Sequence, residues 1–500
     1  MQYESTRGGA ASALSAEVIR RGLAPDGGLY VPAERVSLRR DEIAAFAGRG
    51  YDEAACAVLG RFLTDYSAAE ISDCVEAAYS RGAFDSAEIA PLHPYDGVAS
   101  VLELWHGPTS AFKDMALQIL PHLVVGALRK TGSDKELVIL VATSGDTGKA
   151  ALEGFRDVAG TRIIVFYPEH GVSEMQRLQM VTQEGGNVHA IGVAGGDFDD
   201  AQRGVKAIFS DAEFNERLCG KGFELSSANS INWGRLVPQI AYYFSGYARL
   251  VERGELAMGD RVNVVVPTGN FGNILAAYYA RTMGLPIGTL VCASNANNVL
   301  SDFFTSGTYD KNRPLRKTMS PSMDIIVSSN LERLLYELSD RDPEPVRRWM
   351  AALASGGAYS VGAELKARMS ELFWGGFCSE EETCATIKAA YEEHGYLVDT
   401  HTAVALDVYG KYRKATGDGA KTIVASTASP FKFNESVARA IFGERAVAGK
   451  TEFELLDFLS EKCGLAVPAG LASLRGKAVR HRGTCPASGM RDRVAGILGI

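Results

Sequence analysis

Short, nearly unbroken apolar runs that alternate with longer amphipathic stretches constrain the fold more than any other feature of this sequence. The strand candidates are residues 137–142, 162–167, 188–193, 262–267, 289–294, 324–328 and 422–426. Helical patterns lie between many of them, as at 173–185 and 234–254. Apolar strands separated by helices are typical of parallel sheets that are buried on both faces. The sequence therefore predicts an α/β fold of mostly parallel sheets covered by helices.

The strand candidates form two groups, before and after the helical pattern at 234–254, which predicts two α/β lobes. We expect a mainly helical N-terminal segment at 1–95, a two-lobed region at 96–445 and a helical and loop-like C-terminal segment at 446–500. The smaller lobe is expected at roughly 135–233. Pro91 and Pro94 lie near the first boundary and indicate a break in regular structure there.

Charge and hydropathy exclude several classes of partner. The 500 residues carry a net charge of −8 and hold no basic block, so a nucleic-acid partner is not expected. The longest apolar runs are far too short to cross a bilayer. The first residues, MQYESTRGG, lack the basic start and apolar core of a signal peptide. We therefore expect a cytoplasmic protein with no membrane partner.

The cysteines and histidines do not predict a metal centre. The eight cysteines are scattered and none forms a CxxC pair, so we expect reduced thiols. His93 with His106, and His394 with His401, lack the ligand spacing of a zinc site. We expect no metal.

Two strand-to-helix turns are rich in glycine, hydroxyl and amide side chains: VATSGDTGKAAL at 141–152 and VPTGNFGNILAAYYA at 266–280. Glycine lets the backbone approach a ligand closely, and the free N–H groups of a helix start attract an anion such as phosphate. Ordinary helix capping is the alternative interpretation. Neither turn has the Walker or the G-x-G-x-x-G spacing, which argues against a nucleotide kinase.

A third polar segment, SSANSINWGRLVPQ at 226–239, contributes Asn229, Ser230, Asn232 and Arg235. Arg235 falls just inside a helix start, where a cation opposes the helix dipole. That placement is unfavourable unless an anion lies nearby, so the segment predicts a second anion site. A surface arginine is the alternative.

Lys113 lies among apolar neighbours in WHGPTSAFKDMALQ, residues 105–118. Desolvation disfavours an ammonium group, and the resulting neutral amine can form a Schiff base. A Schiff-base lysine together with phosphate-binding turns indicates pyridoxal phosphate, because the lysine would hold the aldehyde and a turn the phosphate.

The segment LELWHGPTSAFKDMALQ resembles the cofactor-lysine segment of the threonine synthases, which belong to the fold type II pyridoxal-phosphate enzymes. YESTRG, GLAPDGGLYVP, TSGDTGKAAL, NSINWGRLVPQIAYYF, VPTGNFGNILAAYYA and STASPFKF follow in that family's order. The resemblance covers essentially the whole chain. One departure is Ser429, where many relatives are expected to have histidine, and it leaves the contacts around the cofactor ring open.

The resemblance implies roles for individual residues. Lys113 would be the catalytic residue and the Schiff-base lysine. Gly269, Asn270, Phe271, Gly272 and Asn273 would hold the cofactor phosphate, and Thr427 would meet the pyridine nitrogen. The substrate pocket would be lined by Ser144, Asp146, Thr147, Lys149, Asn229, Ser230, Asn232 and Arg235, with Lys149 and Arg235 neutralising the substrate phosphate.

The implied reaction converts O-phospho-L-homoserine and water into L-threonine and phosphate by γ-elimination and β-hydration, in a monomer or homodimer. A threonine or serine dehydratase would use the same glycine-rich turns, and a non-catalytic ligand-binding paralogue could keep the fold. The segment at 226–239 favours the synthase over the dehydratase, and Lys113 argues against the paralogue.

Overall fold

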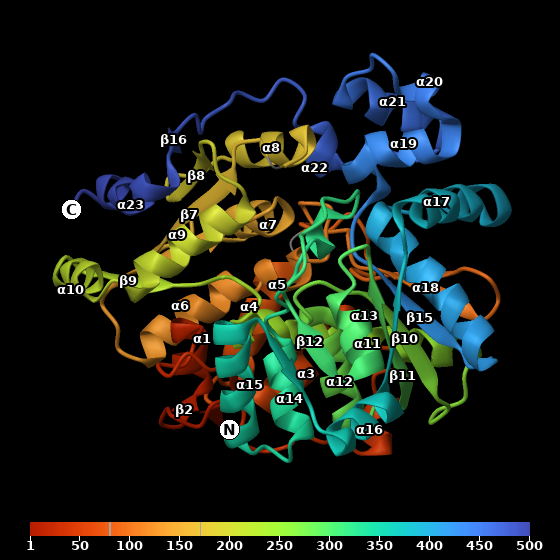
Figure 1. Cartoon of the computed structure of the whole chain (residues 1–500), viewed down its shortest axis with the longest axis horizontal. Helices are drawn as coiled ribbons and strands as arrows, with labels where there is room; N and C mark the ends of the chain where they lie inside the picture. Colours follow the sequence, from red (N-terminus) through yellow and green to blue (C-terminus); the bar gives the residue numbers. More distant parts are fainter. Residues whose placement is uncertain (80–81, 171) are drawn as a thin grey trace.

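The computed structural model describes residues 1–79, 82–170 and 172–500 (Figure 1). Among these residues, no helix combines the length and the apolar character needed to cross a membrane. Two parallel sheets, each covered by helices, form two lobes, as the alternating pattern predicts.

The larger lobe contains a six-stranded sheet of order β14-β11-β10-β15-β5-β4, parallel except for its edge strand β4. Alternate side chains of β10 face two different cores: Val264 and Val266 pack with α11 and α12, whereas Val265 packs with α18. This is why the strand is apolar without a break. The strands are β4 (Leu92–Pro94), β5 (Ala99–Glu103), β10 (Val262–Pro267), β11 (Ile287–Ser294), β14 (Phe373–Phe377) and β15 (Thr422–Ser426).

The helices of the larger lobe lie on both faces of this sheet (Figure 1). They are α5 (Asp114–Leu117), α6 (Leu120–Lys130), α11 (Trp233–Glu252), α12 (Gly272–Thr282), α13 (Val299–Ser306), α14 (Leu331–Leu338), α15 (Pro343–Gly356), α16 (Ala363–Leu372), α17 (Glu380–His394) and α18 (Thr400–Thr416). The strands β12 (Thr308–Asp310) and β13 (Ala358–Ser360) pair in a small antiparallel sheet, and 3-10 turns occur at η1 (Pro321–Met323) and η2 (Pro430–Phe433).

The smaller lobe contains a five-stranded parallel sheet of order β16-β8-β7-β6-β9. Its strands are β6 (Glu136–Ala142), β7 (Thr161–Pro168), β8 (Val188–Val193), β9 (Phe223–Ser226) and β16 (Thr484–Cys485). Its helices are α7 (Asp146–Gly154), α8 (Glu174–Val181), α9 (Phe198–Ser210), α10 (Ala212–Gly220) and α23 (Met490–Leu498). The edge strand β16 and α23 come from the C-terminal segment, far along the chain from the other strands.

The N-terminal region combines helices with a three-stranded antiparallel sheet of order β2-β1-β3, which the expectation of a mainly helical segment did not include. Its elements are β1 (Gln2–Ser5), β2 (Ala13–Leu14), α1 (Ser15–Arg21), β3 (Tyr30–Pro32), α2 (Arg40–Ala44), α3 (Tyr51–Phe62) and α4 (Ala68–Tyr79). Strands of two to four residues are too short to show a periodic pattern.

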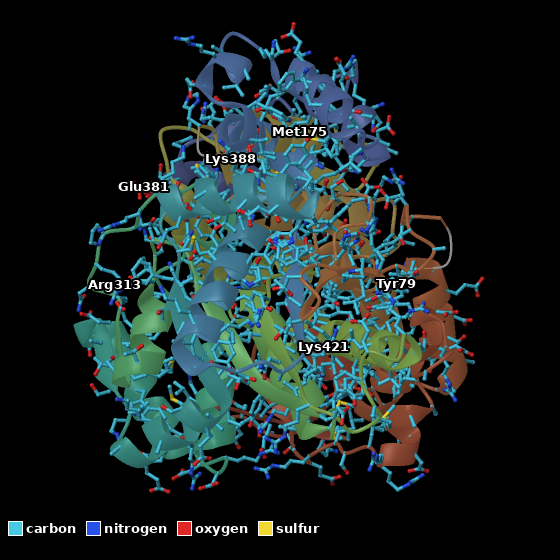
Figure 2. All side chains as sticks on the ribbon, turned by 90° about the vertical axis from the view of Figure 1, so that its right-hand side faces the viewer. Tyr79, Met175, Arg313, Glu381, Lys388 and Lys421 are labelled. Carbon is cyan, nitrogen blue, oxygen red and sulfur yellow. The ribbon has the colours of Figure 1, made fainter. Side chains whose placement is uncertain are left out.

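The C-terminal segment crosses from one lobe to the other (Figure 1). It follows α19 (Asn434–Phe442) and α20 (Glu444–Val447), and it contains α21 (Glu452–Cys463), α22 (Ala469–Ala472) and η3 (Ala487–Gly489). Met175, on α8 of the smaller lobe, shares a buried core with Leu455 and Leu471 of this segment, and lies beneath its helices in Figure 2. The segment therefore packs against both lobes.

One predicted strand is wrong. Residues 324–328 form a loop, although they include Ile325, Ile326 and Val327. The carboxylate of Asp324 accepts hydrogen bonds from Thr318, Asn295 and Asn297 at 2.7–2.9 Å, which holds the segment in a turn. Polar contacts to Asp324, two of them from residues distant in the chain, therefore override the apolar pattern.

Candidate active site

The loop that carries Lys113 is joined to the end of β15 by its backbone. The N–H of Phe112 donates to the carbonyl oxygen of Thr427 at 2.8 Å, and the N–H of Ser429 donates to Ser110 at 3.1 Å. Lys113 directly precedes α5, and Thr427 directly follows β15. The predicted catalytic lysine and the predicted ring-binding threonine therefore belong to neighbouring backbone segments.

Close packing fixes this loop from two sides. Asp114 accepts hydrogen bonds from the N–H and the hydroxyl of Thr109 at 2.8 and 2.9 Å. A Cβ atom on Gly470 of α22 would lie 2.2 Å from the carbonyl oxygen of Pro108, so only glycine fits there. The C-terminal segment thus helps to hold the lysine loop in place.

The Lys113 ammonium is partly buried and has no hydrogen-bond or ion-pair partner among the described residues. Desolvation lowers the pKa of Lys113 to about 8; the positive charges of Arg235 and Lys432 act in the same direction, whereas Asp146 opposes them. The Phe112 ring lies 4.7 Å from the ammonium. Near neutral pH an appreciable fraction of this amine is therefore unprotonated and able to attack an aldehyde.

Asp146 and Lys432 form a buried ion pair beside Lys113. The Lys432 ammonium lies 2.8 Å from Asp146 Oδ1 and donates to the carbonyl oxygen of Thr109 at 2.9 Å. Burial alone would raise the pKa of Asp146, but Lys432 and Lys113 outweigh it and hold that pKa well below its usual range. Asp146 is therefore ionised and fully engaged, and Lys432 is a site residue that the sequence analysis did not single out.

A loop of the larger lobe reaches the same carboxylate. The Ser322 hydroxyl donates to Asp146 Oδ2 at 2.8 Å, and the Ser322 N–H donates to His401 Nε2 at 3.2 Å. His401 Nδ1 lies 2.7 Å from Asp399 Oδ2, so both ring nitrogens of this buried histidine are engaged within the protein. Asp146, on the smaller lobe, is thereby held by residues of the larger lobe.

The turn before α7 leaves two hydroxyl groups available. Gly145 has φ 138°, which favours glycine, and a Cβ there would lie 2.4 Å from Gln176 Cδ. Thr143 Oγ1 accepts from the N–H groups of Gly145 and Gly148, both at 2.9 Å. Ser144 and Thr147 are partly exposed, and their hydroxyl groups bond to no described residue.

The Lys149 ammonium is engaged by neighbouring side chains rather than free to bind a substrate phosphate. It lies 2.9 Å from Glu153 Oε2 and also donates to Gln183 Oε1. The charge of Lys149 is therefore neutralised inside the smaller lobe. The structure gives no support to the expectation that Lys149 neutralises a substrate phosphate.

The turn before α12 offers free hydrogen-bond donors. Phe271 adopts a left-handed conformation with φ 64°, and no side chain of a described residue caps the start of the helix. Asn273 Oδ1 accepts from Tyr242 at 2.8 Å, whereas its buried Nδ2 has no partner among the described residues. Free N–H donors at a helix start suit a phosphate group.

The other residues of this turn support its shape. Gly269 packs against the loop at 320–328, because a Cβ there would lie 2.7 Å from the carbonyl oxygen of Ser322. The carbonyl oxygen of Asn270 accepts from Asn330 Nδ2 at 2.9 Å. Gly272 faces Ser230, whose Cβ would lie 3.9 Å from an added Cβ. The turn and the segment at 226–239 therefore lie side by side.

Within that segment, Arg235 and Asn232 differ in what they can offer a ligand. Arg235 is 3% exposed, its Nε has no partner, and no carboxylate of the described residues lies within ion-pair distance. Its Nη1 donates to the carbonyl oxygen of Ala228, and burial lowers the pKa of Arg235 to about 10. A buried guanidinium without a counterion favours an anionic ligand.

Asn232 instead has a structural role. Its Oδ1 accepts from the N–H of Gly234 at 2.9 Å as the N-cap of α11, and its Nδ2 donates to Ile19 and Ser227. It is fully buried, so the expectation that it binds substrate loses its support. Asn229 and Ser230 remain partly exposed, and their side chains bond to no described residue.

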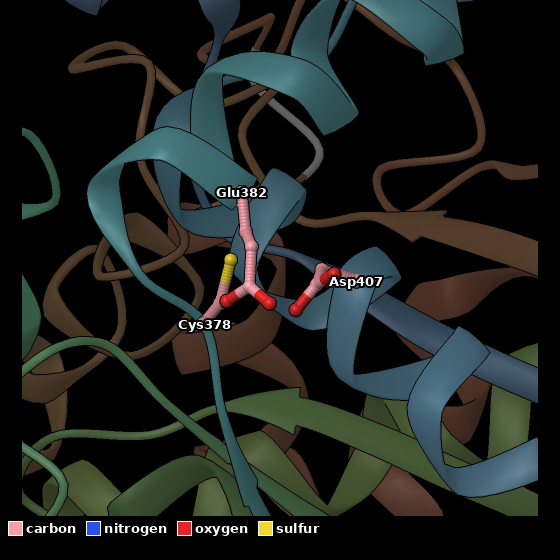
Figure 3. Close-up of side chains that lie close together, drawn as sticks. All are labelled: Cys378, Glu382 and Asp407. Carbon is pink, nitrogen blue, oxygen red and sulfur yellow. The ribbon is translucent and has the colours of Figure 1, made fainter.

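Cys378, Glu382 and Asp407 place sulfur and oxygen atoms within 4.8 Å of one another, outside this site (Figure 3). Lys411 already neutralises the group, because its ammonium lies 2.8 Å from Glu382 and 2.7 Å from Asp407. We interpret the cluster as an ion-pair site.

The site fits a cofactor that carries an aldehyde, a ring nitrogen and a phosphate. Lys113 offers the amine, Thr427 a hydroxyl that bonds to no described residue, and the start of α12 with Asn273 Nδ2 the phosphate donors. A family model described as "Pyridoxal-phosphate dependent enzyme" matches residues 91–427, which include every site residue predicted from the sequence. The chain is therefore a member of the pyridoxal-phosphate-dependent enzymes.

Further matches identify the family within this class of enzymes. Models described as "Threonine synthase N terminus" and "Threonine synthase, C-terminal" match residues 2–79 and 402–466. Threonine synthase of Pseudomonas aeruginosa is 40% identical over 482 residues, which are 96% of this chain and 98% of that protein. The chain belongs to the threonine synthase family.

Solved structures agree with this assignment. A threonine synthase from Brucella melitensis, described as bound to pyridoxal phosphate, has a TM-score of 0.87 and 37% identity, and the match covers 99% of both chains. Yeast threonine synthase also has a TM-score of 0.87, with 32% identity over 100% of this chain and 99% of that one. Human threonine synthase-like 1 is 41% identical over 85% of this chain, which spans only 58% of that longer protein.

Proposed function

We propose that this protein is a threonine synthase that converts O-phospho-L-homoserine and water into L-threonine and phosphate. The observation that carries the proposal is the second anion site. The start of α12 can hold one phosphate, and Arg235 is a separate buried cation without a counterion, close enough to Lys113 to lower its pKa. Two phosphate-binding sites are needed when the substrate carries a phosphate in addition to that of the cofactor.

Pyridoxal phosphate, when bound, supplies an electron sink for the Cα–H bond of an amino acid. Lys113 would bind its aldehyde carbon and, once released, would remove and return the proton at Cα. A pKa near 8 suits this double use, because the amine can both accept and donate a proton near neutral pH.

The remaining side chains would bind and orient. Thr427 would direct its hydroxyl to the pyridine nitrogen, and the turn at Gly269, Asn270, Phe271, Gly272 and Asn273 would hold the cofactor phosphate. Arg235 would hold the substrate phosphate as it leaves Cγ, with Ser144, Thr147, Asn229 and Ser230 lining the pocket. The buried Asp146–Lys432 pair would join the lobes and keep water from the reacting carbons.

We further infer that the chain is organised as an N-terminal segment at 1–95, a two-lobed catalytic region at 96–445 and a C-terminal segment at 446–500. The family matches at 2–79 and 91–427 support the first boundary, whereas the match at 402–466 overlaps the second match and spans the second boundary.

The test is an assay of the purified protein for phosphate release from O-phospho-L-homoserine, with the amino-acid product identified by chromatography. Threonine formed in equal amount to phosphate is expected. Release of ammonia and a 2-oxo acid from threonine or serine, without threonine synthesis, would instead identify a dehydratase. A protein that binds pyridoxal phosphate and turns over neither substrate would be a ligand-binding paralogue.

A further inference from the structure

The side-chain amide of Asn273 lies between the start of α12 and two tyrosines of α11, a helix that packs beside α12 (Figure 1). Its Oδ1 accepts hydrogen bonds from the hydroxyl groups of Tyr242 and Tyr243. Its Nδ2 is buried and has no partner among the described residues. The amide is therefore held by its oxygen, with its two N–H donors free.

The two tyrosines do not hold the amide equally. Gln239 Nε2 donates to the carbonyl oxygen of Arg235 at 2.7 Å, which leaves Gln239 Oε1 as an acceptor. The Tyr242 hydroxyl lies 3.1 Å from this Oε1 and 2.8 Å from Asn273 Oδ1, but it has one hydrogen for both. The Tyr243 hydroxyl bonds to Asn273 through Oδ1, with a longer contact of 3.4 Å to the main-chain oxygen, and it also lies within hydrogen-bond reach of the Tyr242 hydroxyl.

We propose that Tyr243 is a positioning residue for the cofactor phosphate: its hydroxyl holds the oxygen of Asn273, so that the amide nitrogen donates to that phosphate. This inference rests on the phosphate site assigned to the start of α12. Without the hydroxyl, the amide can rotate and present its oxygen to the phosphate, which would exchange an attraction for a repulsion. Tyr242 replaces Tyr243 only in part, because its single hydrogen is shared between Asn273 and Gln239.

The experiment compares the binding of pyridoxal phosphate and of pyridoxal, which lacks the phosphate, by titration of the apoprotein. Tyr243→Phe is expected to bind pyridoxal phosphate about fivefold to tenfold more weakly, the effect of one hydrogen bond. Its affinity for pyridoxal is expected to be unchanged. A purely structural role for Tyr243 would weaken both ligands alike and would overturn the inference.

Tyr247→Phe is the matched control. Tyr247 lies one turn further along α11, is equally buried, and donates its hydroxyl to the carbonyl oxygen of Asp260 at 3.1 Å, away from the phosphate turn. It is expected to bind both ligands as the parent does. Equal pyridoxal phosphate affinities of the two tyrosine variants would overturn the role of Tyr243.

A double-mutant cycle with Asn273→Ala isolates the contact itself. Removal of the Tyr243 hydroxyl is expected to have no further effect on pyridoxal phosphate affinity once Asn273 is alanine. Additive losses would mean that Tyr243 acts by another route, and would overturn the inference. If Tyr243→Phe fails to fold, Asn273→Asp keeps an acceptor for both tyrosines and removes the donor. It should weaken pyridoxal phosphate more than tenfold and leave pyridoxal unchanged, and unchanged affinity for both would contradict the proposal.

The two proposals fail differently in this experiment. A parent protein that binds pyridoxal phosphate no better than pyridoxal would contradict the phosphate site, and Tyr243 would lose its role with it. A parent that strongly prefers pyridoxal phosphate, with no loss in Tyr243→Phe, would contradict the role of Tyr243 alone.

Discussion

Phe112 and Thr427 share a backbone hydrogen bond of 2.8 Å, although 314 other residues separate them in the sequence. Through this bond, the segment that carries Lys113 and the end of the central strand β15 form one rigid support. The proposed base and the proposed ring-binding hydroxyl, which would act on opposite ends of one cofactor, are thereby kept at a fixed separation.

Lys113→Ala is expected to abolish threonine formation, because it removes the amine that binds the cofactor aldehyde and moves the Cα proton. In the parent protein, borohydride should fix pyridoxal phosphate to the peptide that contains Lys113, as read by mass spectrometry. Lys149→Met serves as the control, since Lys149 is engaged by Glu153, and it should keep the label on Lys113. A label on another lysine would contradict the assignment.

Thr427→Val keeps the shape of the side chain and removes its hydroxyl group. We expect a modest loss in cofactor affinity and a larger loss in kcat, because the hydrogen bond positions the ring that stores the electrons. Steady-state kinetics at saturating cofactor separate the two effects. Unchanged kcat would mean that the Thr427 hydroxyl does not form a hydrogen bond with the pyridine nitrogen.

Arg235→Ala should weaken the use of O-phospho-L-homoserine severely, by about 2–5 kcal/mol in kcat/KM, as for other truncations of buried charge pairs. The protein should stay yellow, because the proposed site of the cofactor phosphate is the start of α12. Lys149→Met removes the same charge and should lower the free energy of unfolding, with little effect on kcat/KM. A colourless Arg235→Ala protein with unaltered substrate preference would place Arg235 in the cofactor site.

Lys432→Met should lower the free energy of unfolding by about 3–5 kcal/mol, because it leaves the buried Asp146 carboxylate without its counterion. The double variant Asp146→Asn, Lys432→Met should recover part of this loss. Urea unfolding of the parent, of Lys432→Met, of Asp146→Asn and of the double variant gives the coupling. Independent losses would show that the pair does not hold the lobes together as a unit.

His106 should make stability depend on pH in the alkaline range. Burial would lower the pKa of His106, but hydrogen bonds to Asp85 and Glu103 outweigh it and raise the pKa to about 9. A pKa raised by folding adds stability that is complete below about pH 6.5 and is lost as the pH rises through 9. The Tm difference between parent and His106→Gln should therefore be large at pH 6 and small at pH 10; an equal difference at both would contradict this.

The strands that could be predicted are those buried on both faces, because their sequence is nearly continuously apolar. β6, β7, β8, β10, β11 and β15 all coincide with predicted runs. β14 was not predicted, since Gly375 and Gly376 interrupt its pattern. The apolar run at 324–328 was wrongly predicted to be a strand. Its conformation depends on asparagines about 30 residues earlier that bond to Asp324.

Some residues of the site could likewise be predicted from the sequence and others could not. Lys113 and the two glycine-rich turns could be predicted, because each combines a local strand-to-helix pattern with a characteristic residue type. Lys432, Ser322 and Tyr243 could not, because their importance comes from a partner distant in the chain: Asp146 for the first two and Asn273 for the third. The lysine between two phenylalanines in SPFKF was the local sign that Lys432 is buried.

The edge strand β16 has a consequence for how the protein is made. β6 to β9 leave the ribosome long before residues 484–485, which pair with β8. Until then, β8 presents an unpaired edge to the surroundings, and such edges recruit other chains. The smaller lobe is therefore completed after the larger one, and translation that stops short of β16 would yield an enzyme with every catalytic residue and an exposed, aggregation-prone sheet.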